Sequence, residues 1–113
     1  MFLCYPKCST CQKAKRWLEE SSVEFEERDI KLNKPTKEEL ERWIRISNLP
    51  VRRFFNTSGL IYKELNLKNR LPEMSDDEMI ELLATDGMLV KRPILVADKV
   101  VRVGFKQDEW QNL

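Results

Sequence analysis

The sequence has no histidine and only three cysteines and three glycines among its 113 residues. A closed structural zinc site needs four cysteine or histidine ligands, so this chain, which offers three at most, is not expected to hold one. No glycine-rich or low-complexity stretch is present that would mark a flexible linker. The 20 basic and 19 acidic residues give a net charge of +1, so no overall field attracts nucleic acid or a membrane surface.

Long hydrophobic runs are also missing. No stretch approaches the roughly 20 apolar residues of a transmembrane helix, and the N-terminus lacks the basic and apolar segments of a secretory signal. With 42% hydrophobic and 35% charged residues, the composition is that of a globular protein. We therefore predict a single domain over residues 1–113 in the cytoplasm, with no membrane and no direct nucleic-acid partner. In that reducing compartment a disulfide is more often functional than structural.

The most informative feature is the dithiol Cys8-Ser9-Thr10-Cys11, which lies between an apolar run at 2–6 and an amphipathic pattern. A C-x-x-C sequence beside a strand–helix–strand pattern is typical of a thioredoxin-like redox motif. The free N–H groups and the dipole at a helix start favour negative charge, so Cys8 is predicted to be the nucleophile. Cys11, one turn further on, would resolve the mixed disulfide. Cys4 lies inside an apparent strand and is interpreted as a buried thiol that acts as a small hydrophobe.

The hydrophobic patterning predicts a mixed α/β architecture. A strand over 2–5, a helix over 11–21 and a strand over 23–30 indicate a parallel strand pair joined by a crossover helix. Capping-box sequences begin at Thr36 and Ser75, and each is followed by an apolar stripe typical of a helix. These two helices, with one or two shorter ones around Gly59, predict a helical insertion.

The end of the chain returns to strand character. Segments 94–97 and 100–103 flank a tight turn and predict a β-hairpin. A final helical turn or two over about 106–112 would pack Trp110 against the sheet. The helical insertion, at about 36–86, then separates the strand–helix–strand unit from this hairpin.

Lys91-Arg92-Pro93 precedes the hairpin. A proline at a strand start cannot donate to the ladder, so it suits a strand end or a cis turn. From spacing alone, the two cations beside it are interpreted as solvated.

Three segments together resemble the arsenate reductase-like ArsC/Spx family of thioredoxin-fold proteins: Cys8 to Lys15, Tyr62 to Leu65, and Lys91 to Ile94. The resemblance implies a thioredoxin-like α/β fold with a helical insertion, and a cis proline, Pro93, that lies against the dithiol. It also implies that Arg92 points toward Cys8 and stabilises the thiolate. The resulting candidate catalytic residues are Cys8, Cys11 and Arg92, supported by Ser9, Thr10 and Pro93.

Two branches of this family imply different functions. Glutaredoxin-coupled arsenate reductases use a cysteine matching Cys8 and three arginines, and Arg92 matches one of the three. Asn56 and the pair 105–106 stand near the other two positions. Because an arsenate dianion needs several donors, efficient arsenate reduction is not expected. Spx-type regulators sense oxidation through a C-x-x-C dithiol like this one, but they carry a glycine where this chain has the segment 47–52.

We predict a thiol-based oxidoreductase in which Cys8 attacks a protein disulfide or a small oxidised substrate. Exposed residues between Leu40 and Leu71 would line one side of the site. No bound cofactor or metal is implied, and an external thiol such as glutathione, glutaredoxin or thioredoxin would supply electrons. The alternative is a redox-sensing transcriptional regulator that binds the C-terminal domain of the RNA polymerase α subunit. In a third interpretation, the protein is a remnant of the family in which the thiols persist without a redox role.

Overall fold

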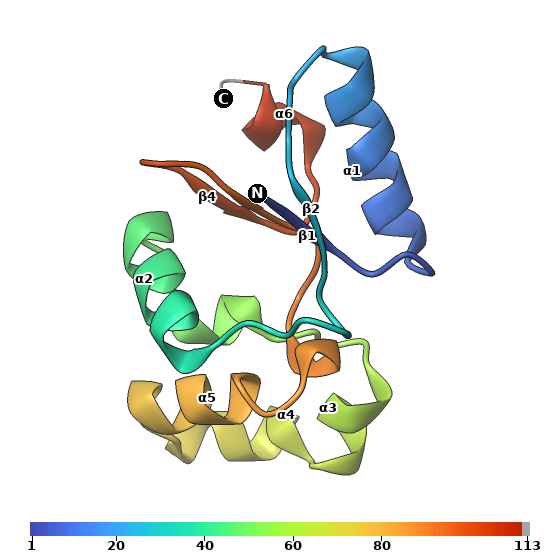
Figure 1. Ribbon diagram of the computed structural model, residues 1–113. Helices are drawn as coiled ribbons and strands as arrows, with labels where there is room; N and C mark the ends of the chain where they lie inside the picture. The colour runs from blue at the N-terminus through green and yellow to red at the C-terminus, as the bar shows by residue number, and fades with distance from the viewer. Residues whose placement is uncertain (112–113) are drawn as a thin grey trace.

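A four-stranded mixed sheet lies between two groups of helices in the computed structural model, which describes residues 1–111 (Figure 1). The strand order is β2-β1-β3-β4. The pair β1 (Phe2–Cys4) and β2 (Glu27–Asp29) is parallel, whereas β3 (Ile94–Val96) runs antiparallel to both β1 and β4 (Val101–Val103). The predicted parallel pair and the predicted C-terminal hairpin are therefore both confirmed.

Helices cover both faces of this sheet (Figure 1). The helices α1 (Ser9–Glu20) and α6 (Gln107–Trp110) lie on one face, and the helical insertion lies on the other. The insertion consists of α2 (Lys37–Ser47), the 3-10 helix η1 (Val51–Phe54), α3 (Leu60–Glu64), α4 (Leu67–Arg70), the 3-10 helix η2 (Leu71–Glu73) and α5 (Asp76–Leu83), and the 3-10 helix η3 (Gly87–Leu89) leads from it to β3. Among residues 1–111, no helix is long and apolar enough to cross a membrane.

The second strand is shorter than the sequence predicts. Only residues 27–29 pair with β1, and Val23 is 38% exposed. The apolar pattern extends further because the Phe25 ring packs edge-on against Phe2, with ring centroids 5.5 Å apart, without joining the ladder. The predicted C-terminal helix is also short: it begins at Gln107, and Asn112 lies outside the described residues.

Both predicted capping boxes are present. The Thr36 hydroxyl accepts the Glu39 N–H at 3.1 Å, and the Glu39 carboxylate accepts the Thr36 N–H at 3.0 Å. Ser75 and Glu78 form the same reciprocal pair at the start of α5. Each box satisfies two N–H groups that the helix itself leaves without partners.

Two hydrophobic cores fill the two faces of the sheet. The large core lies between the sheet and the insertion, around Trp43, Phe54 and Leu83, all fully buried. The small core lies beneath α1 and α6, where Trp110 is fully buried, as predicted for it. The buried members of the small core are Phe2, Cys4, Cys11, Ala14, Leu18, Leu95 and Trp110.

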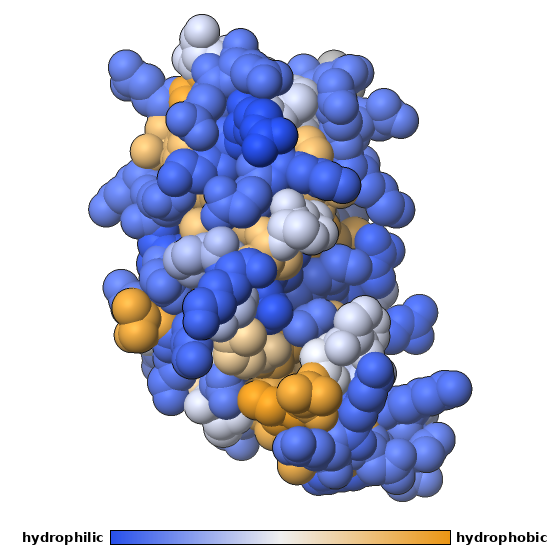
Figure 2. All heavy atoms as spheres, turned by 90° about the vertical axis from the view of Figure 1, so that its right-hand side faces the viewer, coloured by the Kyte–Doolittle hydropathy of each residue, from blue (hydrophilic) through white to orange (hydrophobic). Residues whose placement is uncertain are grey.

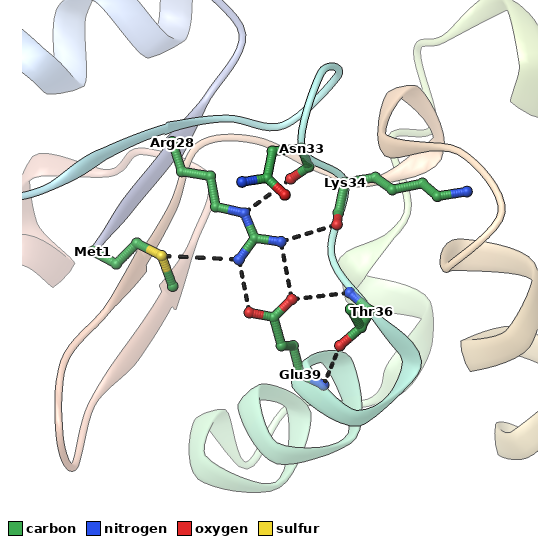
Figure 3. Close-up of polar contacts among 6 residues, drawn as sticks. All are labelled: Met1, Arg28, Asn33, Lys34, Thr36 and Glu39. Carbon is green, nitrogen blue, oxygen red and sulfur yellow. Dashed lines mark hydrogen bonds and ion pairs between the residues drawn. The ribbon is translucent and has the colours of Figure 1, made fainter.

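An arginine of β2 ties the edge of the sheet to the insertion (Figure 3). The Arg28 guanidinium forms two parallel bonds, of 2.7 and 2.9 Å, with the Glu39 carboxylate of α2. It also donates to the carbonyl oxygens of Asn33 and Lys34, both at 2.9 Å, and lies 5.9 Å from the Trp43 ring centroid. Because one planar group satisfies all these acceptors, the loop between β2 and α2 is held in one position.

Gly87 packs directly against the end of β2. A Cβ atom at this position would lie 1.8 Å from the carbonyl oxygen of Ile30. Only glycine permits this approach, so Gly87 seats the chain that continues into the Lys91-Arg92-Pro93 segment.

Candidate functional site

The dithiol lies at the junction of β1 and α1, where the sequence predicts it. Cys8 is the N-cap of α1 in an extended conformation, and its N–H donates to the Tyr5 carbonyl at 2.9 Å. Its side chain is partly exposed, whereas Cys11, one turn into the helix, is only 1% exposed. The two thiols therefore meet very different environments although three residues separate them.

Opposing effects set the acidity of Cys8. Partial burial favours the neutral thiol, but the backbone N–H and thiol of Cys11 and the Thr10 N–H, all at the helix start, favour the thiolate. The positive charge of Arg92 acts in the same direction as these groups, and together they bring the pKa of Cys8 below its ordinary value. The start of α1 thus favours negative charge on the Cys8 sulfur, as the sequence predicts.

The other two thiols are held in the neutral form. Burial, together with the nearby charge of Cys8, raises the pKa of Cys11 to about 12, although the Tyr5 N–H points at its sulfur from 3.4 Å. Burial, together with the carboxylate of Glu27, raises the pKa of Cys4 to about 11. Cys4 is 4% exposed, which agrees with the buried thiol predicted for this position. Cys8 is therefore the thiol that ionises first.

Arg92 enters the site from the chain segment before β3. The Arg92–Pro93 peptide bond is cis, as the family resemblance implies, and Pro93 is buried. The Arg92 guanidinium lies 5.2 Å from the Tyr5 ring centroid, and its Nη1 donates to the Met88 carbonyl at 3.4 Å. Its Nε is buried without a hydrogen-bond partner among the described residues.

A pocket of about 780 Å³ opens over Cys8. One wall is the segment from Phe55 to Ile61 in the insertion, which includes part of the region expected to line the site. Arg53, Met88, Lys91 and Arg92 and the chain after β4 complete it. Figure 2 shows this side of the molecule, where hydrophilic side chains cover most of the surface and apolar ones gather in the lower half.

The structure sorts the predicted site residues into two groups. Cys8, Thr10 and Arg92 line the pocket together, as do Asn56 and the pair 105–106. Ser9 is exposed and does not line it, and Cys11 lies beneath it in the small core.

The sequence analysis interprets Lys91 as a solvated cation, whereas the structure places it in the pocket wall. Arg53 falls within the range 40–71 whose exposed residues are expected to line the site, and Lys106 stands near a position that the family resemblance gives to a site arginine; both line the pocket. Nothing in the pattern of neighbouring residues places Lys91 at the pocket, because contacts across the fold bring it there. The sequence also gives no sign of the contact between Arg92 and Met88, because the acceptor is a backbone carbonyl and not a side chain.

Similar proteins of known structure share the fold described above. A crystal structure of an ArsC family related protein from Bacteroides fragilis is 57% identical and superimposes with a TM-score of 0.97, covering 98% of this chain and 93% of that one. This match confirms the predicted thioredoxin-like fold with its helical insertion.

Two proteins of Bacillus subtilis (strain 168) are similar over nearly the full chain. YusI is 53% identical over 111 residues, covering 98% of this chain and 94% of YusI. The regulatory protein MgsR is 35% identical over 112 residues, covering 99% of this chain and 87% of MgsR. The ArsC family model matches residues 3–113. The match includes the dithiol, the insertion and the cis-proline segment, and this protein belongs to the ArsC family.

Proposed function

We propose that this protein is a thiol–disulfide oxidoreductase in which Cys8 is the nucleophile and Cys11 the resolving thiol. The observation that supports this most directly is the asymmetry of the two thiols. Cys8 has a lowered pKa and lines a pocket, whereas Cys11 is buried in the small core, one helical turn away, with a raised pKa. A nucleophile needs access and charge, and a resolving thiol needs to stay protected until the mixed disulfide forms.

The reaction follows from this geometry. The Cys8 thiolate attacks one sulfur of a substrate disulfide, the S–S bond breaks, and the second substrate sulfur leaves as a thiolate that takes a proton from water. Cys11 then attacks the Cys8 sulfur and releases the first substrate sulfur, to which its proton passes. Two electrons have moved to the substrate, and the protein holds a Cys8–Cys11 disulfide. An external thiol, such as glutathione, glutaredoxin or thioredoxin, reduces that disulfide, and no bound cofactor is required.

Arg92 supports the first step. Its contacts with Tyr5 and Met88 fix the guanidinium beside the pocket, and its charge favours the Cys8 thiolate. Pro93 holds this segment in place, and the Thr10 N–H stabilises negative charge on the Cys8 sulfur. At the two positions where the family resemblance expects further arsenate-binding arginines, Asn56 and the pair 105–106 offer no guanidinium fork to hold the arsenate oxygens, although Lys106 adds positive charge to the wall.

Mapping of the reaction products tests the proposal. Reduced protein mixed with a small disulfide should lose the mass of two hydrogen atoms in the peptide that contains both Cys8 and Cys11. The Cys11→Ser variant should instead accumulate a mixed disulfide on Cys8, and Cys8→Ser should form neither product. A native disulfide that includes Cys4, or a mixed disulfide that forms on Cys11 first, would show that the roles are wrongly assigned.

A redox-responsive regulator is the second candidate, and the similarity to MgsR favours it. The same dithiol would then change a surface that binds the C-terminal domain of the RNA polymerase α subunit. The test is the affinity of that domain for the reduced and the oxidised protein. A dissociation constant that changes on oxidation would support the regulator. Absence of binding in both states, together with turnover of a disulfide, would leave the oxidoreductase.

A further inference from the structure

We propose that the disulfide attacked by Cys8 carries carboxylates next to its sulfur atoms. This inference rests on the proposed oxidoreductase function and specifies its substrate class. The pocket over Cys8 is lined by four cationic side chains and by no carboxylate among the described residues. The four are Arg53, Lys91, Arg92 and Lys106.

These cations are available to a ligand. None of them forms an ion pair with an acidic side chain of the described residues, where the three ion pairs all lie elsewhere. The Arg92 guanidinium has one long hydrogen bond, from Nη1 to the Met88 carbonyl at 3.4 Å, and its Nε has no partner among the described residues. Arg53 also borders a second hollow with Asp108 and Glu109, but within residues 1–111 it forms no ion pair with either carboxylate. Apart from the effect of Arg92 on the Cys8 thiolate, the positive charge of these side chains is therefore available to a bound anion.

The chain as a whole is almost neutral, with a net charge of +1, so four basic side chains around one pocket are a local concentration of positive charge. Basic and acidic residues nearly balance over the whole chain, yet every charged side chain in the pocket wall around Cys8 is basic among the described residues. A thiolate nucleophile repels anionic substrates. Basic side chains around it offset this repulsion and raise the local concentration of anions. The volume of about 780 Å³ is in the range of small-ligand pockets.

The cations surround Cys8 from different parts of the chain. Arg53 comes from η1, Lys91 and Arg92 from the segment before β3, and Lys106 from the segment after β4. A substrate with a carboxylate on each side of its disulfide sulfur can therefore meet a positive charge on more than one side. Leu60, which is 76% exposed at the rim, offers an apolar contact to a longer chain.

The experiment measures how fast Cys8 forms a mixed disulfide in the Cys11→Ser variant. The probes are three symmetric disulfides of a capped five-residue peptide that place Glu, Gln or Lys on both sides of the cysteine. Each rate constant is divided by that of 2-mercaptoethanol with the same peptide, which removes differences in intrinsic reactivity. We expect the Glu peptide to react about tenfold faster than the Lys peptide at low ionic strength, with Gln between them. The difference should narrow as salt is added.

A double variant, Arg53→Gln with Lys106→Gln, should lower the rate for the Glu peptide by about fivefold. Arg52→Gln is the matched control, since it removes one charge from the same 3-10 helix outside the pocket. Unchanged reaction with uncharged iodoacetamide would show that Cys8 itself is unaltered in both proteins.

A disulfide flanked by carboxylates occurs in protein segments and in small molecules. A longer acidic peptide, with a leucine placed to reach Leu60, distinguishes these two kinds of substrate. A further gain in rate indicates a protein segment, and no gain indicates a small molecule; both support the charge preference. Equal normalised rates for the Glu and Lys peptides would overturn the inference while leaving the oxidoreductase intact. No reaction with any of the three would overturn both.

Discussion

The two faces of the sheet bury different kinds of side chain. The large core, on the side of the insertion, is built from aliphatic and aromatic residues and contains no thiol. The small core, beneath α1 and α6, contains both Cys4 and Cys11, packed with the aromatic residues around Trp110. Trp110 contacts Phe2, Trp17 and Phe105, with ring centroids 5.0–6.3 Å away, and its indole N–H donates to the Gly104 carbonyl.

The pocket lies where these two regions meet. Cys8 and Thr10 enter it from the small-core side, and the segment from Phe55 to Ile61 enters from the insertion. The small core sets the acidity of the buried thiols by excluding water, and the large core holds the opposite wall. Thiol reactivity therefore depends on the small core more than on the large one. Substitutions in either core should lower stability, but only those in the small core should also change the reactivity of the thiols.

Truncation of one tryptophan in each core gives the largest expected effect. Trp43→Ala and Trp110→Ala should each lower the free energy of unfolding by about 3–5 kcal/mol, because each removes a fully buried indole. Only Trp110→Ala should also speed alkylation of Cys11 in the folded protein. Denaturant titration and peptide mapping would measure both effects. Faster alkylation of Cys11 in Trp43→Ala than in Trp110→Ala would break the comparison.

The same titration tests the predicted single domain. If both cores belong to one cooperative unit, fluorescence and circular dichroism should report one coincident unfolding transition. Two separated transitions would divide the chain into two units.

A methyl group at Gly87 should cause the next largest loss. Gly87→Ala places a carbon against the Ile30 carbonyl, which neither backbone segment can avoid without moving, so about 2–3 kcal/mol of stability should be lost. Gly59→Ala is the matched control, because its new carbon meets the movable side-chain amide of Asn56 and should cost less than about 1 kcal/mol. Thermal unfolding of both variants would measure the difference, and equal losses would contradict it.

Alkaline pH should weaken the small core. The pKa of Cys4 is about 11 in the folded protein, against an ordinary 9.0. Between these values the unfolded thiol ionises while the folded one keeps its proton, so stability that is intact below pH 9 is lost as the pH rises toward 11. The loss assigned to Cys4 is about 2 kcal/mol. Cys4→Ala should flatten the fall of unfolding free energy between pH 9 and 11, and an unchanged slope would refute this origin.

Local signals account for what the sequence predicts correctly. Helix starts at Thr36 and Ser75, the dithiol at Cys8, and the burial of Trp110 all follow from patterns of neighbouring residues. The start of β2 is predicted too early, at residue 23 and not at Glu27, because Phe25 packs on Phe2 outside the ladder. Contacts across the fold explain the rest: nothing in the sequence pairs Arg28 with Glu39.

Removal of the Arg92 charge should have the smallest effect. Arg92 acts on the pKa of Cys8 in the same direction as the Cys11 and Thr10 groups of α1, and it contributes less than the groups of Cys11. The pKa of Cys8 should therefore rise in Arg92→Ala, and it should rise less than in Cys11→Ala. Lys91→Ala is the control for a neighbouring charge, and it should shift the pKa less than Arg92→Ala. Iodoacetamide rates against pH would give all three values, and indistinguishable curves for Arg92→Ala and Lys91→Ala would show that Arg92 has no specific role.

The most direct test of the account is the rate of alkylation of each of the three thiols in the native, reduced protein as a function of pH, resolved by peptide mass mapping. The asymmetry between the two regions predicts that Cys8 reacts first, with a midpoint below that of an ordinary thiol. Cys11 and Cys4 should stay unmodified until the protein is denatured. Reaction of Cys11 or Cys4 at a rate equal to or above that of Cys8 would contradict the account.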